Sequence, residues 1–279
     1  MAEKSSIEWT ESTWNPTTGC DRTSPGCDHC YALTLSKRLQ AMGNPKYQLD
    51  GDPRTSGPGF GLAVHEDQLD LPRRWSTPRV IFVNSMSDLF HKDVPEEFIL
   101  RVFRVMEETP QHTYQVLTKR TQRLAKVASR LPWPENVWMG VSIETDKYAF
   151  RADHLRTVPA AIRFVSAEPL LGPLEKLELR MIDWVIAGGE SGPGARPMHP
   201  AWARALRDRC IESDVAFFFK QWGAWKPERS KTATPVSISG ELLNEMPKIR
   251  VPGAPVKMRR LGKAEAGRQI DGRTWNQMP

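Results

Sequence analysis

The sequence contains no long hydrophobic run and few cysteines. Its 279 residues include four Cys and four Tyr, and no apolar stretch approaches the ~20 residues that a membrane-spanning helix requires. The segment Met1–Glu8 lacks the basic start and the apolar core of a signal peptide. We therefore expect a cytoplasmic protein with no membrane partner. Thiols stay reduced in that compartment, where a cysteine cluster more often indicates metal binding or catalysis than disulfides.

Positive charge is concentrated at one end of the chain. The sequence has 39 Lys and Arg against 33 Asp and Glu, which gives a net charge of +6. Residues 226–279 hold 11 of the basic and 5 of the acidic side chains, so they account for the whole excess. We expect a domain over residues 1–225 and a basic, Pro/Gly-rich extension over 226–279 packed on it. Such an extension suits a nucleic-acid partner, although a solvated extension fits the composition equally well.

Short apolar runs alternate with segments of helical periodicity. The predicted strands are 79–83, 114–117, 137–141, 162–165, 184–187 and 216–219, preceded by one near Trp14. Helices are predicted over 31–42, near 67–75, and over 95–109, 121–131, 146–157 and 200–213. Strands that alternate with helices predict parallel βα units with right-handed crossovers. Six or seven units fall short of a closed eight-stranded barrel and predict an α/β protein with a partial (β/α)6 barrel.

Three of the four cysteines lie in one short loop. Cys20, Cys27 and Cys30 have the spacing C-x6-C-x2-C, among glycine and proline residues that favour turns. An odd number of thiols does not suit a disulfide framework. A cluster bound only by protein takes four cysteines, and a structural zinc takes four ligands. Three thiolates therefore leave one coordination position open for a substrate or cofactor.

Nearly every predicted strand ends in small polar or charged residues. Besides the cysteines these are Ser85, Asp88, Lys119, Arg120, Ser142, Glu144, Ser166, Glu168, Glu190, Ser191, Lys220 and Gln221. Loops after the carboxyl ends of strands share one face of a βα architecture, so we expect these side chains to surround the cysteine loop. The alternative is that loops are polar in any protein. It explains each residue well and the whole series less well.

An iron–sulfur cluster with an open iron can bind the amino and carboxylate groups of S-adenosylmethionine, whose one-electron reduction yields a 5′-deoxyadenosyl radical. The candidate cofactor-binding residues are Ser85 and Asp88 for the methionine end, Lys119 and Arg120 for its carboxylate, Ser142, and Gly188 and Gly189, which let backbone approach the ligand. The candidates for ribose binding, substrate binding or proton transfer are Glu144, Glu168 and Glu190. Each Glu is equally well explained as a residue favoured at a helix N-terminus.

The same motifs resemble a known family. The segments that carry the resemblance are 13–20, 27–32, 84–90, 117–120, 141–144, 166–170, 188–192, 219–223 and 267–275. They look like the phage-type three-cysteine-motif family, a radical-SAM-like family of phages and bacteria whose reaction is unassigned. The resemblance implies that Cys20, Cys27 and Cys30 bind a cluster. The spacing is three residues longer than the commoner radical-SAM motif C-x3-C-x2-C, and His29 stands where an aromatic ring is usual.

Three functions are compatible with these features. The first is a radical-SAM enzyme with a [4Fe–4S] cluster and S-adenosylmethionine that repairs or modifies DNA or another nucleic acid. Its substrate class rests on the basic extension and on similarity in fold and chemistry to spore photoproduct lyase, and fold alone does not fix function. The second is a non-catalytic nucleic-acid-binding protein with an iron–sulfur or zinc site, the zinc completed by His29 or His91. The third is a redox module that serves a partner protein.

Overall fold

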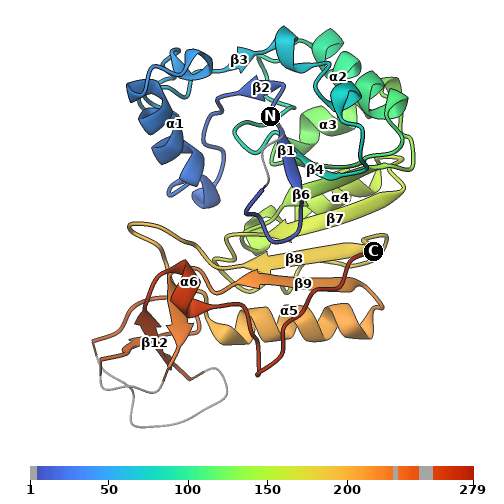
Figure 1. Cartoon of the computed structure of the whole chain (residues 1–279). Helices are drawn as coiled ribbons and strands as arrows, with labels where there is room; N and C mark the ends of the chain where they lie inside the picture. The colour runs from blue at the N-terminus through green and yellow to red at the C-terminus, as the bar shows by residue number, and fades with distance from the viewer. Residues whose placement is uncertain (1–4, 229–231, 245–253) are drawn as a thin grey trace. The chain divides into compact units, whose positions relative to one another are not determined.

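The computed structural model describes residues 5–228, 232–244 and 254–279 (Figure 1). The chain forms two compact units. Unit 1 comprises Met1–Ser142 and Arg151–Phe164, and unit 2 comprises Ile143–Phe150 and Val165–Pro279. No helix in the described part of the chain is long and apolar enough to cross a membrane.

Unit 1 is built on parallel strands. They are β1 (Ser12–Trp14), β4 (Val80–Val83), β5 (Thr113–Thr118) and β6 (Val137–Ser142). β1 pairs with β4, β4 with β5, and β5 with β6, each in parallel register. Ile81 and Val116 are fully buried, as expected for parallel strands covered on both faces. A short antiparallel pair, β2 (Thr17–Thr18) with β3 (Ala63–Val64), follows β1.

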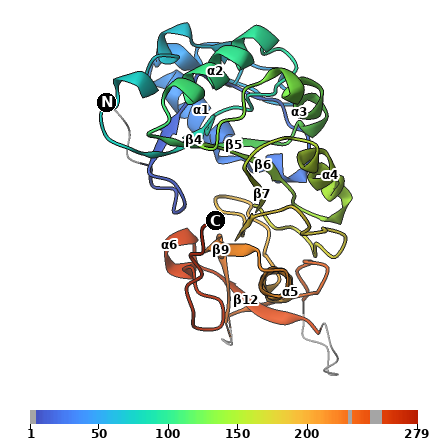
Figure 2. The same cartoon turned by 90° about the vertical axis from the view of Figure 1, so that its right-hand side faces the viewer.

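Helices connect these strands. They are α1 (Tyr31–Ala41), α2 (Glu96–Glu108), α3 (Thr121–Val127) and α4 (Phe150–Arg156). α2 and α3 lie on the same side of β4 and β5 (Figure 2). α2 buries Phe98, Val102 and Met106, which recur every four residues and so share one helical face. Glu96 in its first turn is favourable for the helix dipole.

Three helices differ from the sequence prediction. The helix expected over 121–131 is α3 followed by a 3-10 turn, Ala128–Arg130. The segment near 67–75 is not an α-helix but two 3-10 turns, Glu66–Gln68 and Pro72–Arg74. Pro72 has no amide hydrogen to continue a helix that begins before it, so the prediction failed there. The helix expected over 146–157 is split into a 3-10 turn, Asp146–Tyr148, and α4.

Unit 2 contains parallel strands followed by a small antiparallel sheet. β7 (Ile162–Ala167) begins in unit 1 and ends in unit 2. β8 (Trp184–Gly188) and β9 (Ala216–Gln221) are parallel neighbours, joined through α5 (Pro200–Glu212), which runs alongside them (Figure 1). The antiparallel sheet has the order β10 (Trp225–Pro227), β12 (Val256–Arg260), β11 (Thr234–Val236), and α6 (Lys263–Ala266) lies beside β10.

The end of the chain runs along β9. The Phe219 amide donates to the Trp275 carbonyl at 3.0 Å, and the Gln277 amide donates to the Phe217 carbonyl at 3.2 Å. The Trp184 indole donates to the Gln277 carbonyl at 2.9 Å. The described part of the extension therefore belongs to unit 2, and the division predicted after residue 225 stays a prediction. The expected mixed α/β class, with helices between parallel strands, is confirmed.

Candidate functional site

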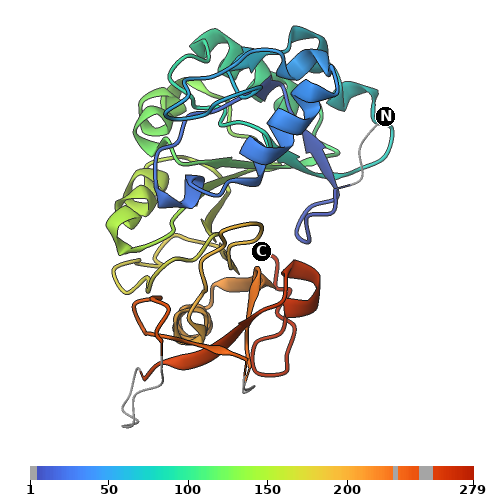
Figure 3. The same cartoon turned by 90° about the vertical axis from the view of Figure 1, so that its left-hand side faces the viewer.

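A glycine fixes the start of the cysteine loop. Gly19 has a φ of +86° and forms a parallel bridge with Ser87, while its amide donates to the Met86 carbonyl at 3.0 Å. A Cβ at Gly19 would lie 2.1 Å from the Gly61 carbonyl oxygen. Only glycine combines this backbone angle with so close an approach. Downstream, the loop forms a 3-10 turn that ends at Cys27, and Cys30 caps α1 (Figure 3).

Cys27 lies within electrostatic reach of each of the other two loop cysteines. None of the chain's four cysteines, all of which are described, is in a disulfide. Burial raises the pKa of Cys20 and of Cys30, and negative charge on Cys27 adds to the rise in both. Cys20 and Cys30 also pack against one apolar cluster, formed by Ala32, Tyr47, Phe60 and Met86. The convergence of the three thiols on one iron–sulfur cluster stays a prediction.

Asp88 ties the loop after β4 to the end of β5. Its carboxylate accepts hydrogen bonds from the Phe90 amide at 2.9 Å, the Thr118 hydroxyl at 2.7 Å and the Lys119 amide at 3.0 Å. Both carboxylate oxygens are therefore engaged within the chain. Asp88 therefore positions the backbone of Lys119 through a hydrogen bond and lies 4.0 Å from the Arg120 guanidinium. The sequence does not show these contacts.

Arg120 reaches the cysteine loop directly. Its Nη2 donates to the Asp21 carbonyl at 3.2 Å and to the Cys20 sulfur at 3.7 Å. Its Nε lies 4.0 Å from the Asp88 carboxylate and, although buried, has no hydrogen-bond partner among the described residues. The guanidinium thus places a positive charge beside Cys20.

A buried histidine paired with a partly exposed aspartate, which sequence reasoning missed, supports the same loop. The His91 Nε2 and Asp21 Oδ2 atoms are 2.9 Å apart, and Asp21 also accepts from the Thr55 hydroxyl at 2.8 Å. Burial lowers the pKa of His91 more than its aspartate partner raises it. Burial alone would raise the pKa of Asp21, but hydrogen bonds from Thr55 and His91 lower it. His91 was a candidate zinc ligand, and here its ring is bound to Asp21.

Ser85 and Ser142 are placed differently. The Ser85 hydroxyl and the Asn15 side chain exchange hydrogen bonds of 3.1 and 3.2 Å, and the Tyr31 hydroxyl donates to the Ser85 carbonyl. Ser85 is therefore linked both to β1 and to the start of α1, next to the cysteine loop. Ser142 is buried at the end of β6, and its carbonyl accepts from Arg151 at 2.7 Å.

A second group of predicted residues meets within unit 2. Glu168 forms an ion pair with Lys220 at 2.7 Å, and its carboxylate accepts a hydrogen bond from the Gln221 side-chain amide at 3.4 Å. A Cβ at Gly188 would lie 3.3 Å from a Glu168 carboxylate oxygen, so the glycine leaves room for this side chain. The Gln221 side-chain amide also donates a hydrogen bond to the Gly189 carbonyl at 2.9 Å. These residues lie at the carboxyl ends of β7, β8 and β9.

Contacts within the chain involve three further candidate residues, Glu190, Gly189 and Glu144. Arg196 engages both oxygens of the buried Glu190 carboxylate through its Nη2, at 2.6 Å, and its Nε, at 2.9 Å. These two hydrogen bonds fix the loop between Glu190 and Arg196. A Cβ at Gly189 would lie 2.1 Å from the Trp222 carbonyl oxygen, so chain packing requires that glycine. Glu144 is fully buried, and its carbonyl accepts from the Leu171 amide at 2.9 Å.

Comparison with known proteins places the chain in a family. The profile of DUF5131, described as a protein of unknown function, matches residues 4–279. The chain belongs to the DUF5131 family. No curated protein matches its sequence.

Among solved structures, the DUF5131 chain is similar to spore photoproduct lyase. One mutant of that enzyme is 13% identical with a TM-score of 0.45, and the match covers 93% of this chain and 71% of that one. A second mutant, with bound AdoMet and dinucleoside spore photoproduct, is 13% identical with a TM-score of 0.42, and the match covers 80% and 59%. Likeness this distant carries no argument about activity.

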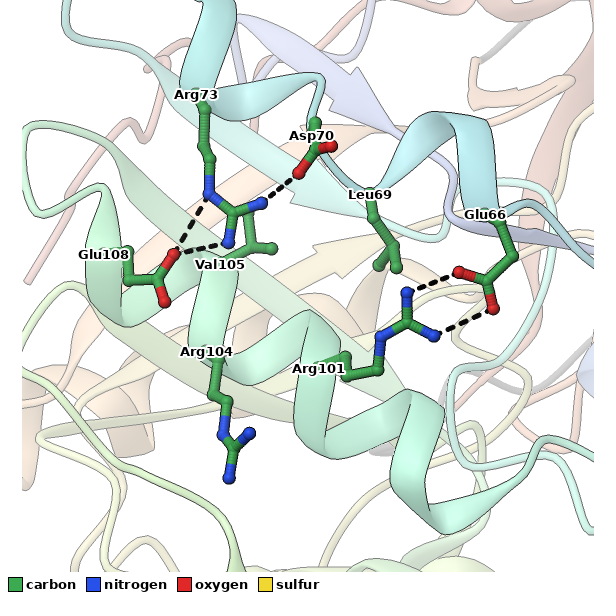
Figure 4. A pocket seen from close by; sticks show the side chains of 8 residues that line it. All are labelled: Glu66, Leu69, Asp70, Arg73, Arg101, Arg104, Val105 and Glu108. Carbon is green, nitrogen blue, oxygen red and sulfur yellow. Dashed lines mark hydrogen bonds and ion pairs between the residues drawn. The ribbon is translucent and has the colours of Figure 1, made fainter.

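A surface pocket of the DUF5131 protein lies among ion pairs. It has a volume of about 250 Å³ (Figure 4). Its lining residues are Glu66, Leu69, Asp70, Arg73, Arg101, Arg104, Val105 and Glu108. Arg101 pairs with Glu66, and Arg73 pairs with both Asp70 and Glu108. None of the predicted site residues lines this pocket.

The cysteine loop of the DUF5131 protein offers sulfur donors of the kind that an iron–sulfur cluster takes. Within the described residues, no group of three or more His, Cys, Asp or Glu is arranged to hold a single metal ion. A four-iron cluster binds each thiolate at a different iron, so its ligands need not converge on one point. Three reduced thiols on one loop, with Lys119 and Arg120 beside them, supply sulfur ligands and balancing positive charge.

The three thiols differ in acidity. Burial raises the pKa of Cys20 to about 12, aided by the charge of Asp88, and burial also raises the pKa of Cys30. Burial acts in the same direction on Cys27. There, however, the charge of Lys119 and hydrogen bonds from the Thr23 and Ser24 backbone outweigh it, so that the pKa of Cys27 is lowered. Cys27 is therefore the thiol that ionises first.

This difference predicts selective modification of the metal-free protein. At pH 8, iodoacetamide is expected to alkylate Cys27 at least about tenfold faster than any other cysteine, because the thiolate is the reactive form and the other three thiols have raised pKa values. Peptide mass spectrometry at timed intervals measures the order. In denaturant all four cysteines should react at similar rates. Faster alkylation of Cys20 or Cys30 would contradict the prediction.

Proposed function

We propose that this DUF5131 protein binds a [4Fe–4S] cluster through Cys20, Cys27 and Cys30 and uses S-adenosylmethionine as a radical-SAM enzyme does. The observation that carries the proposal is that one loop holds three free thiols, with Arg120 donating to the Cys20 sulfur at 3.7 Å. A cluster held there would supply one-electron reduction of S-adenosylmethionine. The partial (β/α)6 barrel and the cytoplasmic location remain predictions.

The residues beside the cysteines have distinct parts in this proposal. Lys119 and Arg120 provide positive charge for the S-adenosylmethionine carboxylate, since charge-assisted hydrogen bonds to carboxylates are among the stronger ones in proteins. Asp88 is a positioning residue, because its oxygens hold the Lys119 amide and the Thr118 hydroxyl. Ser85 offers a hydroxyl next to the loop, where Asn15 orients it.

The unit 2 group is proposed to bind substrate or ribose. Glu168 carries a carboxylate that can accept hydrogen bonds from hydroxyl groups, and its ion pair with Lys220 orients it. Glu190 is assigned a positioning role, because Arg196 already engages both of its oxygens. Glu144 and Ser142 stay candidates without an assigned contact to ligand. The substrate class that we propose is nucleic acid, in keeping with the excess positive charge of residues 226–279.

Anaerobic turnover tests the proposal. Protein reconstituted with iron and sulfide, then given dithionite and S-adenosylmethionine, is expected to produce 5′-deoxyadenosine and methionine above the level of cluster-free protein. Chromatography with mass detection measures both products. A fully loaded, reducible cluster that cleaves no S-adenosylmethionine would refute the enzyme and favour the redox module. Stoichiometric zinc in place of iron would favour the non-catalytic metal-binding alternative.

A further inference from the structure

Two cations face each other across the small antiparallel sheet of unit 2. Lys226 on β10 lies directly opposite Arg259 on β12. Directly opposite residues of antiparallel strands project from the same face, and successive residues alternate between faces. Trp225 and Met258 therefore project from the other face, where they join an apolar cluster with Ala224 and Val236.

A third cation extends this row. Lys257 lies two residues before Arg259 on β12, so the two side chains share a face, about 7 Å apart along the strand. Lys226 and Arg259 are exposed, and Lys257 is half-buried. The solvent face of this sheet thus carries a basic row of Lys226, Lys257 and Arg259.

The fold itself gains little from this arrangement. Like charges directly opposite each other destabilise a sheet, and β10 and β12 place two there. Glu228 offsets part of the repulsion, because its carboxylate lies 3.2 Å from Arg259, but this ion pair is partly exposed and contributes little. An external polyanion would relieve the remaining repulsion. A nucleic-acid duplex is such a polyanion, since each of its strands carries a phosphate for about every 3.4 Å of helix axis.

The chemistry of the face selects the kind of polyanion. Trp225 is the one aromatic residue in β10, β11 and β12, and it is buried on the opposite face. Proteins that hold single strands stack bases on aromatic rings, which this face does not offer. Contacts from Lys and Arg to phosphates position a protein on a duplex without reading sequence. We propose that the basic row binds the phosphate backbone of double-stranded DNA, independently of base sequence.

Fluorescence anisotropy with a labelled 20-base-pair DNA duplex of arbitrary sequence tests this inference. The probe is titrated with full-length protein as purified, without S-adenosylmethionine. Three phosphate contacts predict a slope of about −2.7 for log affinity against log salt, which is about a 40-fold loss of affinity between 50 and 200 mM salt. The triple variant K226Q/K257Q/R259Q should lose this binding. Each single variant should reduce the slope by about 0.9.

A matched control keeps the same change of net charge. The variant K37Q/R104Q/K126Q removes two lysines and one arginine that are exposed in unit 1 and should bind the duplex like wild type. Circular dichroism confirms folding, and the single variants keep the test decisive if the triple variant misfolds. Absence of duplex binding at 50 mM salt, or an unchanged slope in the variants, would overturn the inference. So would equal binding of a single strand that survives the triple substitution.

The inference deepens the nucleic-acid part of the proposed function, and the two fail separately. The anisotropy assay requires neither a loaded cluster nor turnover. Loss of S-adenosylmethionine cleavage with intact duplex binding would therefore refute the enzyme and leave the basic row standing. Cleavage of S-adenosylmethionine without duplex binding would refute the role of the basic row and leave the enzyme standing.

Discussion

Replacing any one of Cys20, Cys27 or Cys30 by alanine is expected to reduce the iron content of reconstituted protein from about four atoms per chain to near zero. With only three protein thiolates, the cluster has no spare ligand, and two thiolates cannot retain it. Arg120 and Lys119 would then face a site without the negative charge that they balance. Iron and sulfide analysis, together with the visible absorption of the cluster, measures the loss.

The fourth cysteine provides the control. Cys210 is fully buried on α5, in unit 2, and packs as a small apolar residue. The Cys210→Ala variant should keep the full iron content and lose only about 1 kcal/mol of stability. Equal loss of iron in this variant, or retention of iron after any of the three loop substitutions, would remove the basis for the proposed cluster.

Gly19→Ala is expected to prevent cluster assembly even though all three cysteines remain. A methyl group there would lie 2.1 Å from the Gly61 carbonyl oxygen, and the residue has a φ of +86°. The left-handed backbone alone costs about 1–2 kcal/mol, and the overlap is with backbone that cannot rotate away. We expect a total loss of at least about 3 kcal/mol, which lowers the midpoint of thermal unfolding by roughly 6–12 °C, with iron content reduced in parallel.

Gly43→Ala separates the backbone angle from the overlap. Gly43 follows α1 with a φ of +73°, and a Cβ there would meet no atom within 4 Å. Its substitution should cost about 1 kcal/mol and leave iron content unchanged. Thermal unfolding followed by circular dichroism compares the two variants. If both glycines behaved alike, the close approach of Gly19 to Gly61 would not be what shapes the cysteine loop.

The proposed site depends on contacts between distant parts of the sequence. Asn15 is bonded to Ser85, Asp21 to His91, and Arg120 to Cys20. Each pair joins the cysteine loop, or the strand before it, to a residue 70 or more positions away. Backbone hydrogen bonds within the loop, such as those from the Cys27 amide to the Ser24 carbonyl and from the Cys30 amide to the Cys27 carbonyl, close single turns. The long-range side-chain contacts attach the loop to the rest of unit 1.

The alternation of strands and helices, and the loop that carries three thiols, could be predicted from the order of residues alone. Buried parallel strands and amphipathic helices leave periodic patterns in the order of residues, and cysteine spacing is visible directly. The pattern failed near Pro72, where a single missing amide hydrogen ends a helix that the apolar spacing favours.

The contacts of the polar strand-end residues could be seen only in the folded chain. The Asp88 carboxylate accepts a hydrogen bond from the Lys119 amide, and the Arg196 guanidinium donates to the Glu190 carboxylate. Gly189 leaves room for the Trp222 carbonyl oxygen, which a side chain at that position would overlap. The fold also places Lys226 opposite Arg259 on one face of a sheet. Hydrogen bonds, ion pairs and close approaches between distant segments follow from how the chain packs, and packing leaves no period in the sequence from which they could be predicted.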